Sequence, residues 1–136
     1  MKFPSKQEIF EYVIKFLIKQ GVRSVGDYNY CRYRGPNGTK CAIGCLLTDK
    51  IYSSDMESNN VSGLISDFRN MLPKYIVENE EFLSELQHLH DDYHNWGKNG
   101  LKRLAIKGVA NSFNLSVDFL KENKWDLNLN KKFLNM

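Results

Sequence analysis

The sequence is poor in cysteine and has no long hydrophobic run. Its 136 residues include three cysteines, an odd number that does not fit the paired framework of small secreted domains. No apolar stretch approaches the roughly 20 residues of a membrane-spanning helix. The N-terminal stretch has Glu8 and Glu11 within its apolar pattern and no small-residue cleavage site, which argues against a signal peptide. These absences predict a cytoplasmic protein with free thiols and no membrane partner.

The charge of the chain shows no strong excess of either sign. Nineteen Lys and Arg against 16 Asp and Glu give +3 at pH 7, which is milder than the concentrated excess of nucleic-acid-binding domains. Hydrophobic residues (42%) and charged residues (26%) are close to globular averages. A chain of this length can bury a core without disulfides or metals. We therefore predict one domain over residues 1–136, with its core at about 5–123 and a C-terminal arm at 124–136.

Hydrophobic periodicity and capping residues predict a mainly helical fold. Ser5 and Glu8 form a capping-box pair before an apolar pattern of helical spacing, and Gly21 is a stop signal. Further helices are expected in CAIGCLL (41–47), from Val61 to before Pro73, over about 80–94 and over about 101–113, with a short one after residue 116.

Residues 29–41 predict one small β-hairpin. The sequence YNYCRYR alternates in character, and GPNG is typical of a turn that closes a hairpin. We expect strands at 29–34 and 38–41, packed on the helices because an isolated two-stranded ribbon is only marginally stable. The expected fold class is mainly α, a single helical domain with one small β-hairpin, at the border of α+β.

A cysteine and a histidine are candidates for catalysis. Cys41 begins the predicted helix CAIGCLL beside Lys40, and a helix N-terminus can lower the pKa of a thiol. His90, followed by Asp91, could be the base. A Cys/His hydrolase or transferase using Cys41, His90 and Asp91 is therefore one alternative. The structural alternative is a buried Cys41 under the hairpin and a His90 hydrogen-bonded at the edge of the core.

A zinc site is a second alternative. His90 and His94 are four residues apart, the spacing with which one helix gives two ligands to a metal. Cys41 and Cys45 are also four residues apart, but on an apolar segment, where a free cysteine usually packs as a small hydrophobe. We assign no metal ligand and no cofactor; a site drawn from these four residues and Cys31 stays open.

Two surfaces could bind larger partners. Tyr30, Arg32 and Arg34 project together from the predicted hairpin and could stack a planar ring and bind phosphate or carboxylate; the alternative is a solvated edge whose charges prevent aggregation. Residues 101–120 have the pattern of a helix-turn-helix, but the second helix offers few side chains that read bases. A DNA-binding regulator is therefore a third candidate function, and nucleic acid is not the expected partner.

Several stretches resemble a group of small uncharacterised phage and bacterial proteins. The pattern is Cys-x-Tyr-Arg-Gly-Pro-x-Gly-x-Lys-Cys-Ala-x-Gly, then Met-Glu, and later Leu-Gln-x-x-His-Asp, and the resemblance covers about residues 5–113. It implies these positions: Cys31, Tyr33, Arg34, Gly35, Pro36, Gly38, Lys40, Cys41, Gly44, Met56, Glu57, Gln87, His90 and Asp91. The sequence departs from the pattern at Ser58, where glycine is expected, and at Thr48, where proline is expected.

We predict a pocket flanked by the hairpin and the His90 helix. The expected ligand-binding residues are Tyr33, Arg34, Lys40, Glu57, Gln87, His90 and Asp91. Polar groups of both signs beside apolar walls are typical of a small-molecule or peptide pocket. The leading hypothesis is a non-enzymatic accessory protein, phage-encoded by resemblance and of host-takeover or anti-defence type. It would capture a host protein or a nucleotide-like small molecule in the bacterial cytoplasm, and a homo-oligomer is compatible with the sequence.

Overall fold

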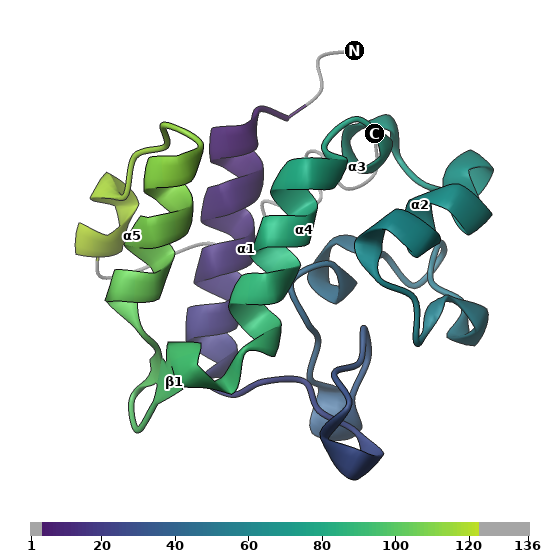
Figure 1. The fold of residues 1–136 in the computed structure, drawn as a ribbon, viewed down its shortest axis with the longest axis horizontal. Coiled ribbons are helices and arrows are strands. Elements are labelled where there is room, and N and C mark those ends of the chain that lie inside the picture. Colours follow the sequence, from purple (N-terminus) through teal and green to yellow (C-terminus); the bar gives the residue numbers. More distant parts are fainter. Residues whose placement is uncertain (1–3, 123–136) are drawn as a thin grey trace.

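Helix α4 lies at the centre of the fold. The structure is a computed structural model that describes residues 4–122 (Figure 1). Its α-helices are α1 (Lys6–Gln20), α2 (Val61–Phe68), α3 (Lys74–Val77), α4 (Glu80–Asp91) and α5 (Arg103–Ser112). Helix α4 contacts each of the other four. The fold is mainly helical, as predicted, and none of the helices in residues 4–122 is both long and apolar enough to span a membrane. The predicted arm at 124–136 lies outside the described residues.

The ends of α1 follow the capping signals in the sequence. The Glu8 amide donates to Ser5 Oγ at 3.1 Å, and the Ser5 amide donates to Glu8 Oε1 at 3.0 Å. At the other end Gly21 adopts the left-handed conformation (φ +78°) and donates its amide to the Leu17 carbonyl. Because glycine has no Cβ, it takes this conformation at little cost. The predicted first helix is confirmed at both ends.

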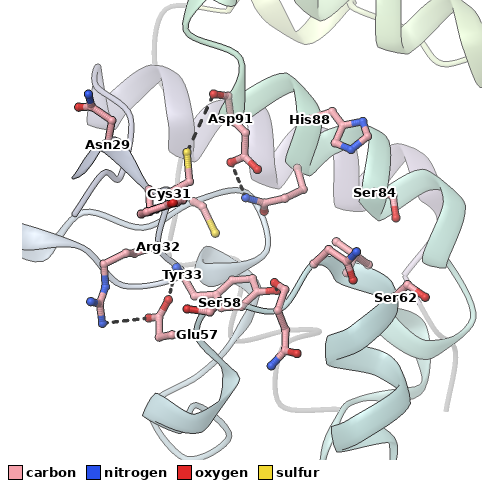
Figure 2. A pocket seen from close by; sticks show the side chains of 16 residues that line it. Asn29, Cys31, Arg32, Tyr33, Glu57, Ser58, Ser62, Ser84, His88 and Asp91 are labelled. Carbon is pink, nitrogen blue, oxygen red and sulfur yellow. Dashed lines mark hydrogen bonds and ion pairs between the residues drawn. The ribbon is translucent and has the colours of Figure 1, made fainter. Parts of the chain in front are cut away.

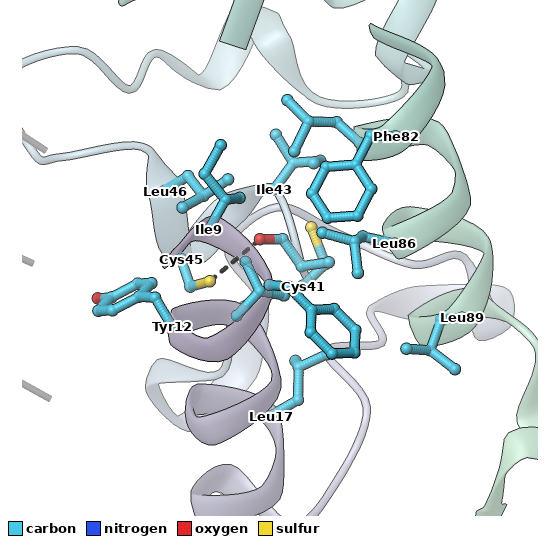
Figure 3. Packing of buried hydrophobic residues seen from close by; sticks show 14 of the residues in the cluster. Ile9, Tyr12, Leu17, Cys41, Ile43, Cys45, Leu46, Phe82, Leu86 and Leu89 are labelled. Atoms are coloured by element: carbon cyan, nitrogen blue, oxygen red, sulfur yellow. Dashed lines mark hydrogen bonds between the residues drawn. The ribbon is translucent and has the colours of Figure 1, made fainter. Parts of the chain in front are cut away.

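The core lies where α1 and α4 enclose the segment 41–47. Figure 3 shows Ile9 of α1 and Leu86 of α4 on opposite sides of Ile43 and Cys41. All four are buried. A fully buried leucine or isoleucine stabilises a fold by about 1.5–3 kcal/mol relative to an exposed one, so this apolar contact ties the irregular middle of the chain to the two longest helices.

The β-hairpin lies at a different place from the predicted one. Strands β1 (Trp96–Gly97) and β2 (Gly100–Leu101) pair antiparallel, at the junction between the helices expected over about 80–94 and about 101–113. The predicted strands at 29–34 and 38–41 are wrong. Within 22–47 the described chain has two isolated antiparallel pairs instead, Val25 with Cys31 and Arg34 with Lys40.

Each isolated pair is closed by a tight turn with two residues at positive φ. Asn37 (φ 60°) and Gly38 (φ 74°) form one, and Tyr28 (φ 59°) and Asn29 (φ 62°) form the other. These are the backbone angles of type I′ hairpin turns, for which Asn-Gly is a favoured sequence. The chain thus reverses twice within a few residues, and neither reversal leaves room for a strand longer than one residue pair.

The predicted helix over CAIGCLL is replaced by a single 3-10 turn, Gly44–Leu46. The remaining short 3-10 turns are Asp27–Asn29, Pro36–Gly38, Ser54–Met56, Arg69–Met71, Tyr93–Asn95 and Asp118–Lys121. Gly44 packs against the backbone of Tyr33: a Cβ built at Gly44 would overlap the Tyr33 carbonyl oxygen. This close approach fixes segment 41–47 against residue 33.

We expect Gly44→Ala to destabilise the protein by about 1–3 kcal/mol, the usual cost of overpacking a tight contact. The matched control is Gly108→Ala in α5, because a Cβ there meets no atom within 4 Å; a helix-interior alanine should stabilise by about 0.5–1 kcal/mol. Urea unfolding followed by circular dichroism measures both changes. Equal effects of the two substitutions would contradict the close packing of residue 44.

Candidate functional site

A pocket of about 610 Å³ opens beside α4 (Figure 2). One wall is residues 29–33, the second is the loop 57–60 with the start of α2, and the third is one face of α4. The residues that line it are Asn29, Tyr30, Cys31, Arg32, Tyr33, Cys41, Glu57, Ser58, Asn59, Asn60, Val61, Ser62, Ser84, Gln87, His88 and Asp91. The pocket therefore lies between the segment predicted as a hairpin and the helix that carries His90.

Four of the seven predicted ligand-binding residues line this pocket, and three do not. Tyr33, Glu57, Gln87 and Asp91 line it. Arg34, Lys40 and His90 are not part of its lining. These three side chains or their backbones are instead engaged in contacts that hold the loops in place.

The Glu57 carboxylate organises the loop wall of the pocket. It accepts hydrogen bonds from the backbone amides of Tyr33 (2.9 Å) and Arg34 (3.1 Å). It also accepts one from the Tyr52 hydroxyl (2.6 Å), whose pKa is raised by burial and by this bond. Its side chain is 11% exposed, with Arg32 at 3.8 Å as its ion-pair partner. Because bonds to a charged acceptor are the stronger ones, Glu57 holds residues 33 and 34 firmly.

The Arg34 side chain and the Lys40 backbone make contacts that hold the loops in place. Arg34 pairs with Asp49 at 2.7 Å, donates to the Leu47 carbonyl at 2.9 Å, and lies 4.3 Å from the ring centre of Tyr52. The backbone of Lys40 is bonded on both sides by the Gln20 amide group, each time at 2.8 Å. Of the two residues expected to bind an anionic ligand, Arg34 thus uses its side chain, and Lys40 its backbone, to secure the loops to each other and to α1.

His90 holds the loop at residue 24 on the edge of α4. Its imidazole is fully buried, and Nε2 accepts a hydrogen bond from the Ser24 amide at 2.9 Å. Since Nε2 is an acceptor, the proton of the neutral ring is on Nδ1, which lies 2.8 Å from Asp91 Oδ1 and donates to it. One helical turn earlier, Gln87 accepts from the Ile43 amide at 3.1 Å and donates to the same Asp91 oxygen at 2.7 Å.

The thiols lack the features of an activated nucleophile. Burial raises the pKa of Cys41 to about 12, and that of Cys45 well above the usual 9.0. Cys31 is half-buried, and burial together with the charge of Asp91 raises its pKa to about 11. No α-helix begins at Cys41, so the expected helix N-terminus is missing. The geometry matches a structural Cys41 and a hydrogen-bonded His90, and does not favour the hydrolase alternative.

The geometry does not favour a zinc site either. Helix α4 ends at Asp91, so His94 leaves the helix; it is exposed and pairs with Asp92 at 2.9 Å. The hydrogen bond from the His94 amide, followed by this side-chain bond, lowers the pKa of Asp92. Within residues 4–122 one set of three candidate ligand groups lies together, Cys31, His90 and Asp91, within 4.8 Å of one another. Both nitrogens of His90 already have partners, so a metal would have to break one bond.

The segment 101–120 does not build a DNA-reading helix. After α5 the chain makes a turn and then a four-residue 3-10 turn, Asp118–Lys121, which is too short to lie along a major groove. The second half of the predicted helix-turn-helix is therefore absent from the described chain.

None of the asparagines and serines that line the pocket was among the expected ligand-binding residues: Asn29, Ser58, Asn59, Asn60, Ser62 and Ser84. A signal for the α4 wall was available. Ser84, Gln87, His88 and Asp91 are spaced at i, i+3, i+4 and i+7, which puts them on one face of a helix. The residues of the loop wall show no such regular spacing in the sequence.

Comparisons of the chain with protein-family models, with curated proteins and with solved structures find no match. The resemblance carried by the Cys31–Gly44 and Leu86–Asp91 patterns stays a prediction.

We expect Glu57→Gln to lower the free energy of unfolding by about 1–3 kcal/mol, because it removes the charge and one of two acceptor oxygens from three partly buried donors. Asp55→Asn, an exposed carboxylate two residues earlier, is the control and should change stability by less than about 0.5 kcal/mol. Chemical unfolding of both variants measures the difference. Equal stabilities would contradict the central role of the Glu57 carboxylate.

We expect Cys31 to react slowly with iodoacetamide in the native protein at pH 8. A pKa raised from 9.0 to about 11 leaves about 100-fold less thiolate than in an unfolded chain. Mass spectrometry of the alkylated protein should find the label on Cys31 before Cys41 or Cys45, both of which are buried. Rapid labelling of Cys41 would contradict this picture and favour a thiol enzyme.

Proposed function

We propose that this protein is a non-enzymatic binding protein that captures a host protein in the pocket beside α4. The observation that carries the proposal is the pocket itself, because three separate segments of the chain bring polar side chains together around about 610 Å³. The groups that could do chemistry there are Cys41, which lines the pocket, and His90, which does not; both are held in structural hydrogen bonds. Such a cavity supports recognition better than turnover.

A protein ligand suits the rim of the pocket. Tyr28 and Tyr30 flank the lining residue Asn29 and are 91% and 74% exposed. Tyrosine is enriched at protein interfaces, where it adds contact area with few rotatable bonds. Tyr28 also has φ 59°, a costly conformation for a bulky residue that is typical of functional loops.

A nucleotide suits the pocket less well. Phosphate groups need unpaired cationic side chains, and Arg34 is bonded to Asp49 and Leu47. The one arginine that lines the pocket, Arg32, pairs with Glu57. A nucleotide-like ligand is therefore the alternative that titration with nucleotides must distinguish from a protein ligand.

The biological setting is part of the same proposal. The resemblance to phage and bacterial proteins supports a phage-encoded accessory role of host-takeover or anti-defence type, in the cytoplasm of the bacterial cell. It rests on the residue pattern from Cys31 to Asp91.

A pocket-filling substitution tests the proposal. Ser84→Trp adds a large ring to the α4 wall, and Lys107→Trp puts the same ring on the exposed face of α5, away from the pocket. Both variants, checked for native unfolding curves, and the wild-type protein are used for affinity capture from a bacterial host lysate and for calorimetric titration with nucleotides.

We expect one host protein to be retained by the wild type and by Lys107→Trp, and lost from Ser84→Trp. Nucleotide binding that is kept in Lys107→Trp and lost in Ser84→Trp would show that the ligand of the pocket is a small molecule and not a protein. A partner that Ser84→Trp retains equally, or the absence of any ligand, would overturn the proposal.

A further inference from the structure

The pocket contains one carboxylate that lacks a cationic partner. Its charged lining residues are Arg32, Glu57 and Asp91. Arg32 and Glu57 pair with each other. Within residues 4–122 no lysine or arginine makes an ion pair with the Asp91 carboxylate: the nearby Arg23 donates to the Asp91 backbone carbonyl, at 2.9 Å, instead. Among the charged lining residues, the one carboxylate without an ion-pair partner in the described chain is therefore that of Asp91.

Asp91 is held in one orientation. Gln87 and His90 both donate to Oδ1, and neither of them occupies Oδ2. The side chain is 38% exposed, and Figure 2 shows it on the pocket side of α4, with the Cys31 thiol beside it. A carboxylate that is already oriented loses little side-chain entropy when a ligand binds.

The position of Asp91 in its helix makes this negative charge costly. Asp91 is the last residue of α4, at the end where the helix dipole is negative and disfavours a carboxylate. The adjacent His90 is neutral, because Nε2 accepts the Ser24 amide bond. A cation bound at the carboxylate would add to the positive charge that Arg23 already brings to this helix end.

We infer that the pocket accepts a guanidinium or primary ammonium group, which pairs with Asp91. This inference rests on the proposed function and gives its ligand a chemical class, an exposed arginine or lysine side chain of the partner. The remaining lining suits such a group: Ser84 and Asn59 offer oxygen acceptors, and the exposed ring of Tyr30 at the rim offers a face for a cation–π contact. A free polyamine has the same chemistry and is the other source to be distinguished.

The test compares ligands that differ only in charge. The probes are acetyl-Gly-Arg-Gly-amide, the same peptide with neutral citrulline in place of arginine, the lysine peptide, spermidine and adenosine monophosphate. Binding is followed by amide chemical shifts in NMR spectra of the whole protein. The variants are Asp91→Asn, which keeps an oxygen for Gln87 and His90, and the control Asp92→Asn, whose carboxylate caps His94 and does not line the pocket.

We expect the arginine peptide to shift the amides of residues 31, 87 and 91 in a saturable way. The affinity should fall at least tenfold for the citrulline peptide and for Asp91→Asn, and stay unchanged for Asp92→Asn. Unfolding curves establish that both variants fold. If spermidine binds saturably and neither the arginine peptide nor the lysine peptide does, the result would support recognition of a cationic group and identify a free amine as its source.

Other results would overturn the inference. Equal affinity of the citrulline and arginine peptides would do so, as would undiminished affinity of Asp91→Asn. Binding of adenosine monophosphate in the pocket, without any cationic probe, would overturn it while leaving a ligand-binding pocket in place. Host-protein capture that is lost in Ser84→Trp but kept in Asp91→Asn would likewise leave the proposed function standing and remove the role of the cation.

Discussion

The hydrogen bond from the Ser24 amide to His90 Nε2 is the contact on which the irregular half of the fold depends. Residues 22–60 contain only 3-10 turns and isolated residue pairs, so their backbone amides cannot all be satisfied by regular ladders, yet buried amides need partners. Side chains of α4 supply them: His90 accepts from residue 24, and Gln87 from residue 43. Removing the imidazole would leave a buried amide without an acceptor, which costs about 1–3 kcal/mol.

Glu57 does the same work from the opposite side of the pocket. It accepts the amides of residues 33 and 34, so the segment 24–43 is held at one edge by α4 and at the other by the loop before α2. The pocket is the space left between these two attachments. Several lining groups also hold its walls: Gln87 bonds the Ile43 amide and Asp91, Asn60 caps α2, and the Tyr33 hydroxyl and the Asn59 amide group bond the loop before α2. Within residues 4–122 the side chains of Ser62 and Ser84 make no such hydrogen bond and are available to a ligand.

How far the sequence predicts this structure depends on the range of the interactions. The capping box at Ser5, the stop at Gly21 and the stripe of α4 are local, and the helices form as predicted. The strands at 29–41 and the helix at 41–47 have equally good local patterns, but Gly44 packs on the Tyr33 backbone and Glu57 binds amides more than 20 residues away. Contacts between residues that far apart in the sequence leave no periodic pattern from which they could be predicted. The same limit applies to the pocket: Tyr33, Glu57, Gln87 and Asp91 line it, whereas Arg34, Lys40 and His90 do not. The Arg34 side chain pairs with Asp49, the Lys40 backbone bonds Gln20, and His90 bonds the Ser24 amide.

The local charge of the pocket is opposite to that of the chain. A net charge of +3 gives a basic partner no long-range attraction, because steering depends on the summed field of the protein. Recognition at Asp91 must therefore come from short-range contacts, which are effective only after the two surfaces meet. Tyr30, which lines the same pocket, and its neighbour Tyr28 are exposed and provide such contact area, and contacts that exclude water strengthen a charge pair. In this arrangement the aromatic rim supplies contact area and the single oriented carboxylate selects which side chain enters.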